Sequence, residues 1–302
     1  MSMIPVIFEM ETSDPDDFMT LLWLADNPKI DLKAVVVTPG SKDQCQLVRW
    51  GLDHCGQREI PIGALHGPEW WDTQDGKKLR VSGFHYPTYG EEIKKHDVGW
   101  VCDGPELIDE LAEYNMTVLV GSPPKNLGAA FRRSDRVYVS RWVQQGGFAG
   151  DNMVEKPLEK FKGRLTCPSF NPGGAPNQVM DLLQNKRISV RLFVSKNVCH
   201  GVTWTHKMQS ELKSRIKNRR TGLETMIKGL DTYLEKKGVA KAMHDIVAAC
   251  CVVDDSVCEF KKAEIYREKG EWGARPYSPT AFTVTKISVG FDEEKFLSVL
   301  SS

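Results

Sequence analysis

The stretch that decides the fold of this chain reads Glu9-Met10-Glu11-Thr12-Ser13-Asp14-Pro15-Asp16-Asp17. It follows the short apolar run 4–8 and precedes the segment 18–24, in which the apolar residues have helical spacing. This order is typical of a strand, a tight loop and a helix. In open α/β sheets, the loops at the carboxyl ends of the strands bind the ligands. The stretch is therefore a candidate binding loop as well as a marker of the fold.

The loop carries five carboxylates within nine residues, so like charges are crowded there. A hard cation would relieve the repulsion, because clusters of oxygen ligands suit Ca²⁺ or Mg²⁺. The alternative is that Asp14 caps the following helix and that the other carboxylates are solvated surface charge. The residues of the loop leave both interpretations open.

The composition narrows the class of protein. The chain has 302 residues, with 40 basic and 40 acidic side chains and no net charge. This balance argues against a protein that binds a nucleic-acid backbone or an anionic membrane, and no apolar run reaches membrane-spanning length. The N-terminus lacks a basic region followed by an apolar one, and the eight scattered cysteines form no CxxC pair. We therefore expect a cytoplasmic protein with reduced thiols and with no nucleic-acid or membrane partner.

Strand and helix patterns alternate along the chain. Further strands are expected at 32–37, 60–65, 117–120, 137–143 and 188–194, with helices between them. This rhythm favours an α/β fold with a mostly parallel central sheet flanked by helices. We expect an apolar helix from Val239 to Cys251 and closing strands at 258–266 and 281–287, with a hairpin or loop around 272–276. Since no repeat or linker is visible, residues 1–302 are expected to form a single domain.

Two segments depart from this rhythm. Residues 66–100 are rich in aromatic residues, histidine and glycine without periodicity, as in functional lids and binding loops. His85 and Tyr86 in this segment are candidates for stacking on a planar ligand, although such a loop can also pack back on the body of the protein. The segment 209–237 is helical and strongly basic. We interpret it as a solvated helix face rather than a nucleic-acid arm, because no aromatic residues interleave with its charges.

Three further loop motifs follow the acidic loop. They are Gly121-Ser122-Pro123-Pro124-Lys125-Asn126, Ser169-Phe170-Asn171 and the pair His244-Asp245. Alone, each has an ordinary explanation; His244-Asp245, for example, could be a helix cap beside a core histidine. Together and in this order, the motifs resemble those of the inosine–uridine-preferring nucleoside hydrolases, which are calcium-dependent N-ribosidases. The resemblance extends from about residue 4 to residue 250, at loop motifs only.

The resemblance implies a fold, a reaction and a cofactor. It implies hydrolysis of the N-glycosidic bond of a nucleoside or a nucleoside-like ribosyl compound, bound Ca²⁺, and a role in purine or pyrimidine salvage. It also implies a homodimer or a homotetramer, with a small-molecule substrate as the partner. The identity of the base stays open.

The resemblance also implies roles for particular residues. The family's first loop reads Asp-x-Asp-Pro-Gly-x-Asp-Asp, and its closing pair matches Asp16 and Asp17. Asp17 is then a calcium ligand, while Asp16 binds the ribose hydroxyls. In the late His-Asp pair, Asp245 is a further calcium ligand and His244 donates a proton to the departing base. The family's Gly-Pro-Leu-Thr-Asn loop implies a calcium ligand at the backbone carbonyl of Lys125.

Sugar contacts are matched only in part. The resemblance implies that Asn171 binds ribose, and Asn152 matches an upstream asparagine with the same role. Ser169 replaces a glutamate that holds the 5′-hydroxyl, and Ser41 stands where the family has another ribose-binding asparagine. These departures favour an altered sugar, such as a 5′-modified one.

The general base is the least certain assignment. Cleavage through an oxocarbenium-like state needs an activated water on one face of the sugar and help for the leaving group on the other. The family's second aspartate, both calcium ligand and base, aligns with Thr12 without a gap and with Glu11 after a one-residue insertion. Asp14 is an additional carboxylate that can substitute. Glu11 or Asp14 is therefore expected to take the proton from water, with Glu11 also a metal ligand.

A protein of another class could use the same pocket. A calcium-dependent nucleoside- or sugar-binding protein would keep the fold and lose the base, and the uncertain match at Glu11 and Thr12 favours it. The presence of His244 argues against it, because binding alone does not require a proton donor. A metal phosphatase is less well supported, since two-metal sites need more ligands than these loops supply.

Overall fold

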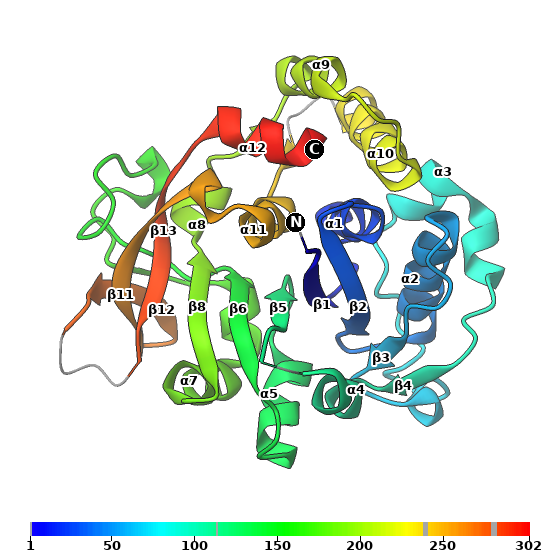
Figure 1. Cartoon of the computed structure of the whole chain (residues 1–302), viewed down its shortest axis with the longest axis horizontal. Helices are drawn as coiled ribbons and strands as arrows, with labels where there is room; N and C mark the ends of the chain where they lie inside the picture. Colours follow the sequence, from blue (N-terminus) through cyan, green and yellow to red (C-terminus); the bar gives the residue numbers. More distant parts are fainter. Residues whose placement is uncertain (1, 113, 238–240, 279–282) are drawn as a thin grey trace.

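The computed structural model of the chain describes residues 2–112, 114–237, 241–278 and 283–302. The strands of its main sheet are β1 (Ile4–Met10), β2 (Ile30–Val37), β3 (Ile62–Ala64), β4 (Val101–Asp103), β5 (Thr117–Val120), β6 (Val139–Gln145), β7 (Thr166–Cys167), β8 (Ile188–Val194), β11 (Cys258–Glu268), β12 (Glu271–Pro276) and β13 (Thr285–Phe291). They lie in the order β4-β3-β2-β1-β5-β6-β8-β13-β11-β12-β7 (Figure 1). Neighbours from β4 to β13 pair in parallel, and the remaining pairs are antiparallel.

Helices cover both faces of this sheet. They are α1 (Pro15–Ala25), α2 (Lys42–His54), α3 (His85–Tyr89), α4 (Gly104–Leu111), α5 (Lys125–Arg133), α6 (Phe170–Gly174), α7 (Pro176–Gln184), α8 (Lys196–Cys199), α9 (His206–Arg215), α10 (Thr221–Lys237), α11 (Asp245–Val253) and α12 (Glu293–Ser301). Figure 1 shows α4, α5 and α7 on one side of the sheet and α1, α11 and α12 on the other. A small antiparallel pair, β9 (Thr203–Trp204) and β10 (Lys241–Ala242), lies outside the main sheet.

Side chains of β1 alternate between two apolar cores. Val6, Phe8 and Met10 pack with α1 and α11, while Ile7 belongs to the core beneath α4 and α5. This alternation is the strand period of two, because successive side chains point to opposite faces of a sheet. It also turns Glu9 towards α5, so the first carboxylate of the acidic stretch points away from the others. The predicted α/β fold with a mostly parallel sheet is confirmed.

Some predicted boundaries were wrong. The basic segment 209–237 is not one helix, because α9 ends at Arg215 and α10 begins at Thr221. The helix expected from Val239 to Cys251 has its first positions outside the described residues. Within the described residues, α11 begins only at Asp245, after β10. The hairpin or loop expected around 272–276 is a hairpin, in which β12 pairs antiparallel with β11.

The closing strand expected at 281–287 also differs. Its first two positions lie outside the described residues, and β13 begins at Thr285. The cysteine prediction agrees with the structure, since all eight cysteines lie within the described residues and are free thiols. No helix in the described part of the chain has the length and apolar character needed to cross a bilayer.

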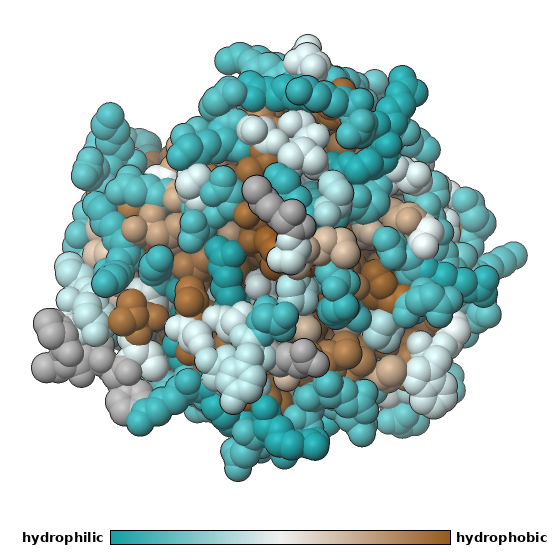
Figure 2. Space-filling model, in the orientation of Figure 1, coloured by the Kyte–Doolittle hydropathy of each residue, from teal (hydrophilic) through white to brown (hydrophobic). Residues whose placement is uncertain are grey.

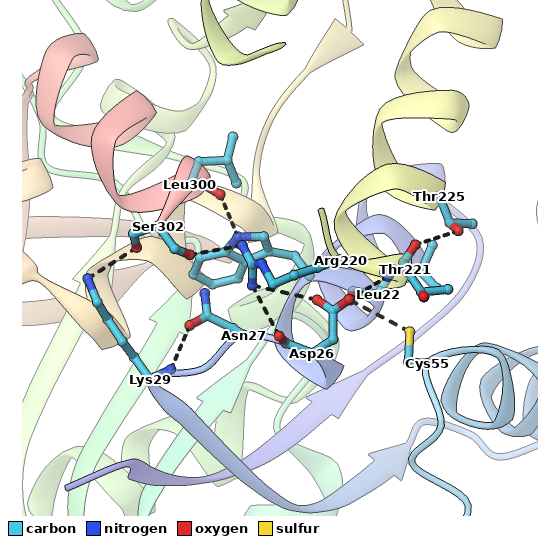
Figure 3. Close-up of polar contacts among 12 residues, drawn as sticks. Leu22, Asp26, Asn27, Lys29, Cys55, Arg220, Thr221, Thr225, Leu300 and Ser302 are labelled. Atoms are coloured by element: carbon cyan, nitrogen blue, oxygen red, sulfur yellow. Dashed lines mark hydrogen bonds and ion pairs between the residues drawn. The ribbon is translucent and has the colours of Figure 1, made fainter. Parts of the chain in front are cut away.

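Basic residues of α9 and the start of α10 pair with acidic partners. Lys213 lies 2.7 Å from the Asp231 carboxylate, and Arg215 lies 2.6 Å from Glu294. Arg220 donates to the backbone oxygens of Asp26 and Ser302 at 3.2 and 2.9 Å, so it joins α10 to the end of α1 and to the end of the chain (Figure 3). These contacts fit the interpretation of a helix face balanced by local acids. Figure 2 likewise shows hydrophilic residues interspersed with scattered apolar ones on the face in view.

Candidate functional site

A pocket of about 380 Å³ lies where the carboxyl ends of β1, β5, β6 and β8 meet. Its lining residues are Glu11, Ser13, Asp14, Asp16, Asp17, Gly121, Gln145, Ser169, Phe170, Asn171, Lys196, His200, His244 and Asp245. Parallel strands bring the loops at their carboxyl ends to one edge of the sheet, which is where such folds bind ligands. All four predicted loop motifs therefore contribute residues here, although they are far apart in sequence.

Glu9 anchors the acidic loop from beneath. Its carboxylate accepts hydrogen bonds from the backbone amides of Asn126 and Leu127 at 2.8 and 3.0 Å, at the start of α5. Burial raises the pKa of Glu9 to about 7, even though these donors favour the charged form. Glu9 thus ties the loop after β1 to the loop after β5, and it does not line the pocket.

Asp16 joins α1 to α11. Its Oδ2 atom accepts hydrogen bonds from the backbone amides of His244 and Asp245, both at 2.6 Å. A carboxylate is favoured there because the first amides of a helix lack partners within the helix. The other oxygen, Oδ1, is buried and has no hydrogen-bond partner among the described residues. Asp16 therefore holds a free acceptor at the pocket.

Asp17 and Asp245 are two buried carboxyl groups in close proximity. Burial raises the pKa of each well above its ordinary value, and nearby negative charge raises it further, chiefly from Asp245 for Asp17 and from Asp16 for Asp245. The backbone amide of Glu11 donates to Asp17 Oδ1 at 3.3 Å, which brings the Glu11 segment to the same place. Such a crowded set of oxygen donors fits a hard cation, which would hold these carboxylates in the charged form.

Glu11 and Asp14 have different surroundings. Asp14 caps α1 by accepting from the amide of Asp16 at 2.9 Å, and it forms an ion pair with Lys241 at 2.8 Å. Burial raises the pKa of Asp14, but the charge and hydrogen bond of Lys241, the amide of Asp16 and the charge of His244 together leave this pKa below its usual value. Burial raises the pKa of Glu11 against the hydrogen bonds from Ser13. Asp14 is thus the predicted cap, whereas Glu11 is the better proton acceptor.

The pocket lining also includes an amide and two imidazoles. Asn171 Nδ2 donates to the Gly121 carbonyl at 2.9 Å and to Gln145 Oε1 at 2.7 Å, which fixes the orientation of its side chain. The ring of His244 stacks on that of His200, with centroids 4.8 Å apart and an angle of 29°. Burial lowers the pKa of His244, while the charge of Asp16 opposes this effect.

Two residues that were predicted to bind calcium or ribose do not line the pocket. Lys125 is the first residue of α5, so its carbonyl belongs to the helix, and the residue of that loop which lines the pocket is Gly121. Asn152 is exposed and donates to the carbonyl of Ala274 at 2.9 Å, outside the pocket. The structure therefore does not bring either residue to the pocket.

The aromatic loop packs back on the body of the protein. His85 is fully buried and makes edge contacts with Phe18 at a centroid distance of 5.2 Å; burial lowers its pKa to about 4. Tyr86 is also buried, beneath the ammonium group of Lys94. Neither residue lines the pocket, so the structure does not support the expectation that they stack on a base.

Other pocket residues were not singled out from the sequence. They include Gln145 at the end of β6 and Lys196 and His200 after β8. The sequence feature that could have identified them is their position after a strand. Polar residues that follow a parallel strand reach the same edge of the sheet. Phe170 lines the pocket as well, and its side chain is 73% exposed.

Comparisons with known proteins agree with this geometry. No protein-family model matches the chain. An uncharacterized protein of Aquifex aeolicus (strain VF5) is 27% identical over 279 residues, which are 89% of this chain and 90% of that protein. Among solved structures, an inosine-guanosine nucleoside hydrolase superposes with a TM-score of 0.70 at 16% identity, over 98% of this chain and 97% of that one.

Two further solved structures give the same result. A plant nucleoside hydrolase has a TM-score of 0.67 at 18% identity and covers 98% of this chain and 97% of its own. The chain has the nucleoside hydrolase fold. An inosine-uridine preferring nucleoside hydrolase from Bacillus anthracis also reaches 0.67, at 13% identity, over 99% and 98% of the two chains. The likeness in fold therefore extends over 98–99% of the chain.

Proposed function

We propose that this protein is a calcium-dependent hydrolase that cleaves the N-glycosidic bond of a nucleoside or a nucleoside-like ribosyl compound. The observation that carries the proposal is the set of side chains that meet in one pocket. In a nucleoside hydrolase fold, one edge of the sheet brings together the buried carboxylates Asp16, Asp17 and Asp245, the amide of Asn171 and the imidazole of His244.

The metal would be held by Asp17, Asp245 and Glu11. These side chains offer hard oxygen ligands, and the raised pKa values of the two aspartates show how poorly the pocket tolerates their charges alone. When bound, Ca²⁺ would supply positive charge that orients a water and lowers its pKa.

Protein side chains would supply the general base, the sugar contacts and the proton donor. Glu11 would accept the proton of the attacking water, because its carboxylate lines the pocket and its backbone amide bonds to Asp17, so it lies close to the proposed metal. Asp16 Oδ1, buried and without a partner among the described residues, would accept a hydrogen bond from a sugar hydroxyl, beside Asn171. His244 would donate its proton to the departing base.

The sugar-binding end supports a modified substrate. Ser169 uses its hydroxyl to accept a hydrogen bond from the amide of Gly147 at 2.9 Å. Lys196 also lines this end and donates to the carbonyl of Pro168 at 2.7 Å. A short, already bonded side chain at position 169 leaves room for a larger 5′ substituent. The cytoplasmic location stays a prediction from the sequence features, and the homodimer or homotetramer stays a prediction from the resemblance.

Chromatography of reaction products tests the proposal. Purified protein with Ca²⁺ is incubated with natural and 5′-modified nucleosides, and the free base is measured. We expect base release that falls about 10²–10⁴-fold in His244→Ala and in Glu11→Gln, the usual contribution of a general acid or base. Asp14→Asn should lose much less, because Asp14 acts as a helix cap.

The same experiment distinguishes the second class of function. If calcium stabilises the protein but no member of the panel releases base, the calcium-dependent binding protein becomes the better description. Base release that is unchanged in His244→Ala would remove His244 from the mechanism.

A further inference from the structure

Three potential metal ligands of a different kind meet at one wall of the pocket. The thiol of Cys199 and the imidazoles of His200 and His244 place donor atoms within 4.8 Å of one another. Cys199 ends α8, His200 directly follows it, and His244 caps the start of α11. The contact therefore joins two helix ends that are remote in sequence, and neither the resemblance nor the proposed reaction uses Cys199 or His200.

The chemistry of these donors suits a thiophilic cation. Zinc binds thiolate sulfur at about 2.3 Å and imidazole nitrogen at about 2.0–2.1 Å, so tetrahedral ligands lie about 3.3–3.6 Å from one another. Side-chain rotations that bring the three donors together by about 1 Å would meet this geometry. His244 Nε2 is buried and has no hydrogen-bond partner among the described residues, so it is free to bind.

A hydrogen bond already positions the sulfur of Cys199. Gln145 Nε2 lies 3.2 Å from Cys199 Sγ and donates to it, as outer-shell amides do to metal-bound thiolates. Gln145 is itself buried and bonded to Asn171 at 2.7 Å, so the donor is held in place. The sulfur is thus positioned by a hydrogen bond before any metal arrives.

The charges near the cluster are mixed. Asp16 and Asp245 lie close enough to act on the Cys199 sulfur, and their negative charge favours a cation. Lys160 Nζ lies 3.3 Å from His200 Nδ1 and opposes a cation. Lys160 is exposed, however, and its long side chain can swing into solvent when His200 binds a metal.

We propose that Cys199, His200 and His244 form a binding site for a thiophilic divalent cation such as Zn²⁺, with its fourth position open to the pocket. The site differs from the carboxylate cluster in kind, because sulfur and imidazole ligands select zinc-like metals and carboxylates select calcium. Metal binding would withdraw His244 from the departing base, so zinc would inhibit turnover. This inhibition rests on the proposed function, whereas the binding does not.

Cobalt spectroscopy tests the binding without any substrate. The full-length protein, freed of metal, is titrated with Co²⁺ in the presence of excess Ca²⁺. We expect one equivalent to bind, with the intense visible bands of tetrahedral Co²⁺ and a thiolate-to-cobalt charge-transfer band. Cys199→Ser should lose the charge-transfer band and bind Co²⁺ at least tenfold more weakly. Cys102→Ser removes another free thiol, one outside the pocket, and should behave as wild type.

Each outcome decides the proposal. Absence of the charge-transfer band in the wild type, or its persistence in Cys199→Ser, would overturn the site. Thermal melting of the variants confirms that a lost signal does not come from unfolding. If Co²⁺ binds as described but the protein hydrolyses no nucleoside, the metal site stands and only the proposed reaction fails.

Discussion

The substitution Asp17→Asn is expected to stabilise the metal-free protein and to abolish its stabilisation by calcium. Asp17 and Asp245 are both buried, and each is close to other negative charge. At an effective dielectric constant of about 20, two like charges about 4 Å apart repel by about 4 kcal/mol. A proton retained on the pair relieves part of this repulsion, so we expect a gain of about 2 kcal/mol in the free energy of unfolding. The asparagine oxygen can still accept the hydrogen bond from the Glu11 amide.

Thermal unfolding with EDTA and with Ca²⁺ measures both effects. An unfolding entropy of about 2.1 cal/mol/K per residue over 302 residues converts the 2 kcal/mol gain into a Tm increase of about 3 °C in EDTA. Calcium at about 100 times its Kd should stabilise the wild type by about 2.7 kcal/mol, or about 4 °C, and Asp17→Asn hardly at all. The exposed Asp72 provides a matched control, and Asp72→Asn should follow the wild type in both buffers.

One result would refute this reasoning. If Asp17→Asn melts with the wild type in EDTA and keeps the full calcium shift, the carboxylates neither repel one another nor hold the metal.

Three other changes test the surroundings of the site. Glu9→Ala should lower stability by about 2–4 kcal/mol in urea unfolding, because two buried amides at the start of α5 lose their acceptor; a wild-type midpoint would contradict this role. Burial lowers the pKa of His85 to about 4, so its neutral ring contributes stability that is complete above pH 6.5 and is lost as the pH falls towards 4, by about 3 kcal/mol. His85→Phe should therefore lose about that much less stability than the wild type between pH 7 and pH 4, and equal losses would show that the ring is not buried neutral. Arg220→Ala should cost about 2 kcal/mol, because Asp26 and the backbone of Ser302 lose their partner, while Arg220→Lys should recover part of the loss; equal midpoints for all three proteins would exclude this role (Figure 3).

Local patterns in the sequence predicted most of the sheet. Strand alternation is a property of consecutive residues, and in β1 it divides Val6 and Ile7 between the two cores as the pattern requires. Element ends were less predictable where distant residues decide them. The start of α11 at Asp245 depends on the carboxylate of Asp16, which caps it from a segment more than two hundred residues earlier.

The pocket residues show the same contrast between what local patterns predict and what distant contacts decide. The short motifs of Asp16, Asp17 and Asp245, which follow a strand or open a helix, lead to side chains that line the pocket. Lys125 and Asn152 do not line it, because the path of a loop depends on packing that a motif match does not show.

The sequence by itself determined the alternation of strands and helices, the acidic loop after the first strand and the crowding of its charges, since these depend on neighbouring residues. Only the tertiary structure decided which charges are buried together, because the order of parallel strands brings Asp17 and Asp245 to one edge. It also placed His85 in the core and brought the buried Cys199 close to His200 and His244. Burial and contact between remote side chains arise from packing across the sheet, which no local pattern records.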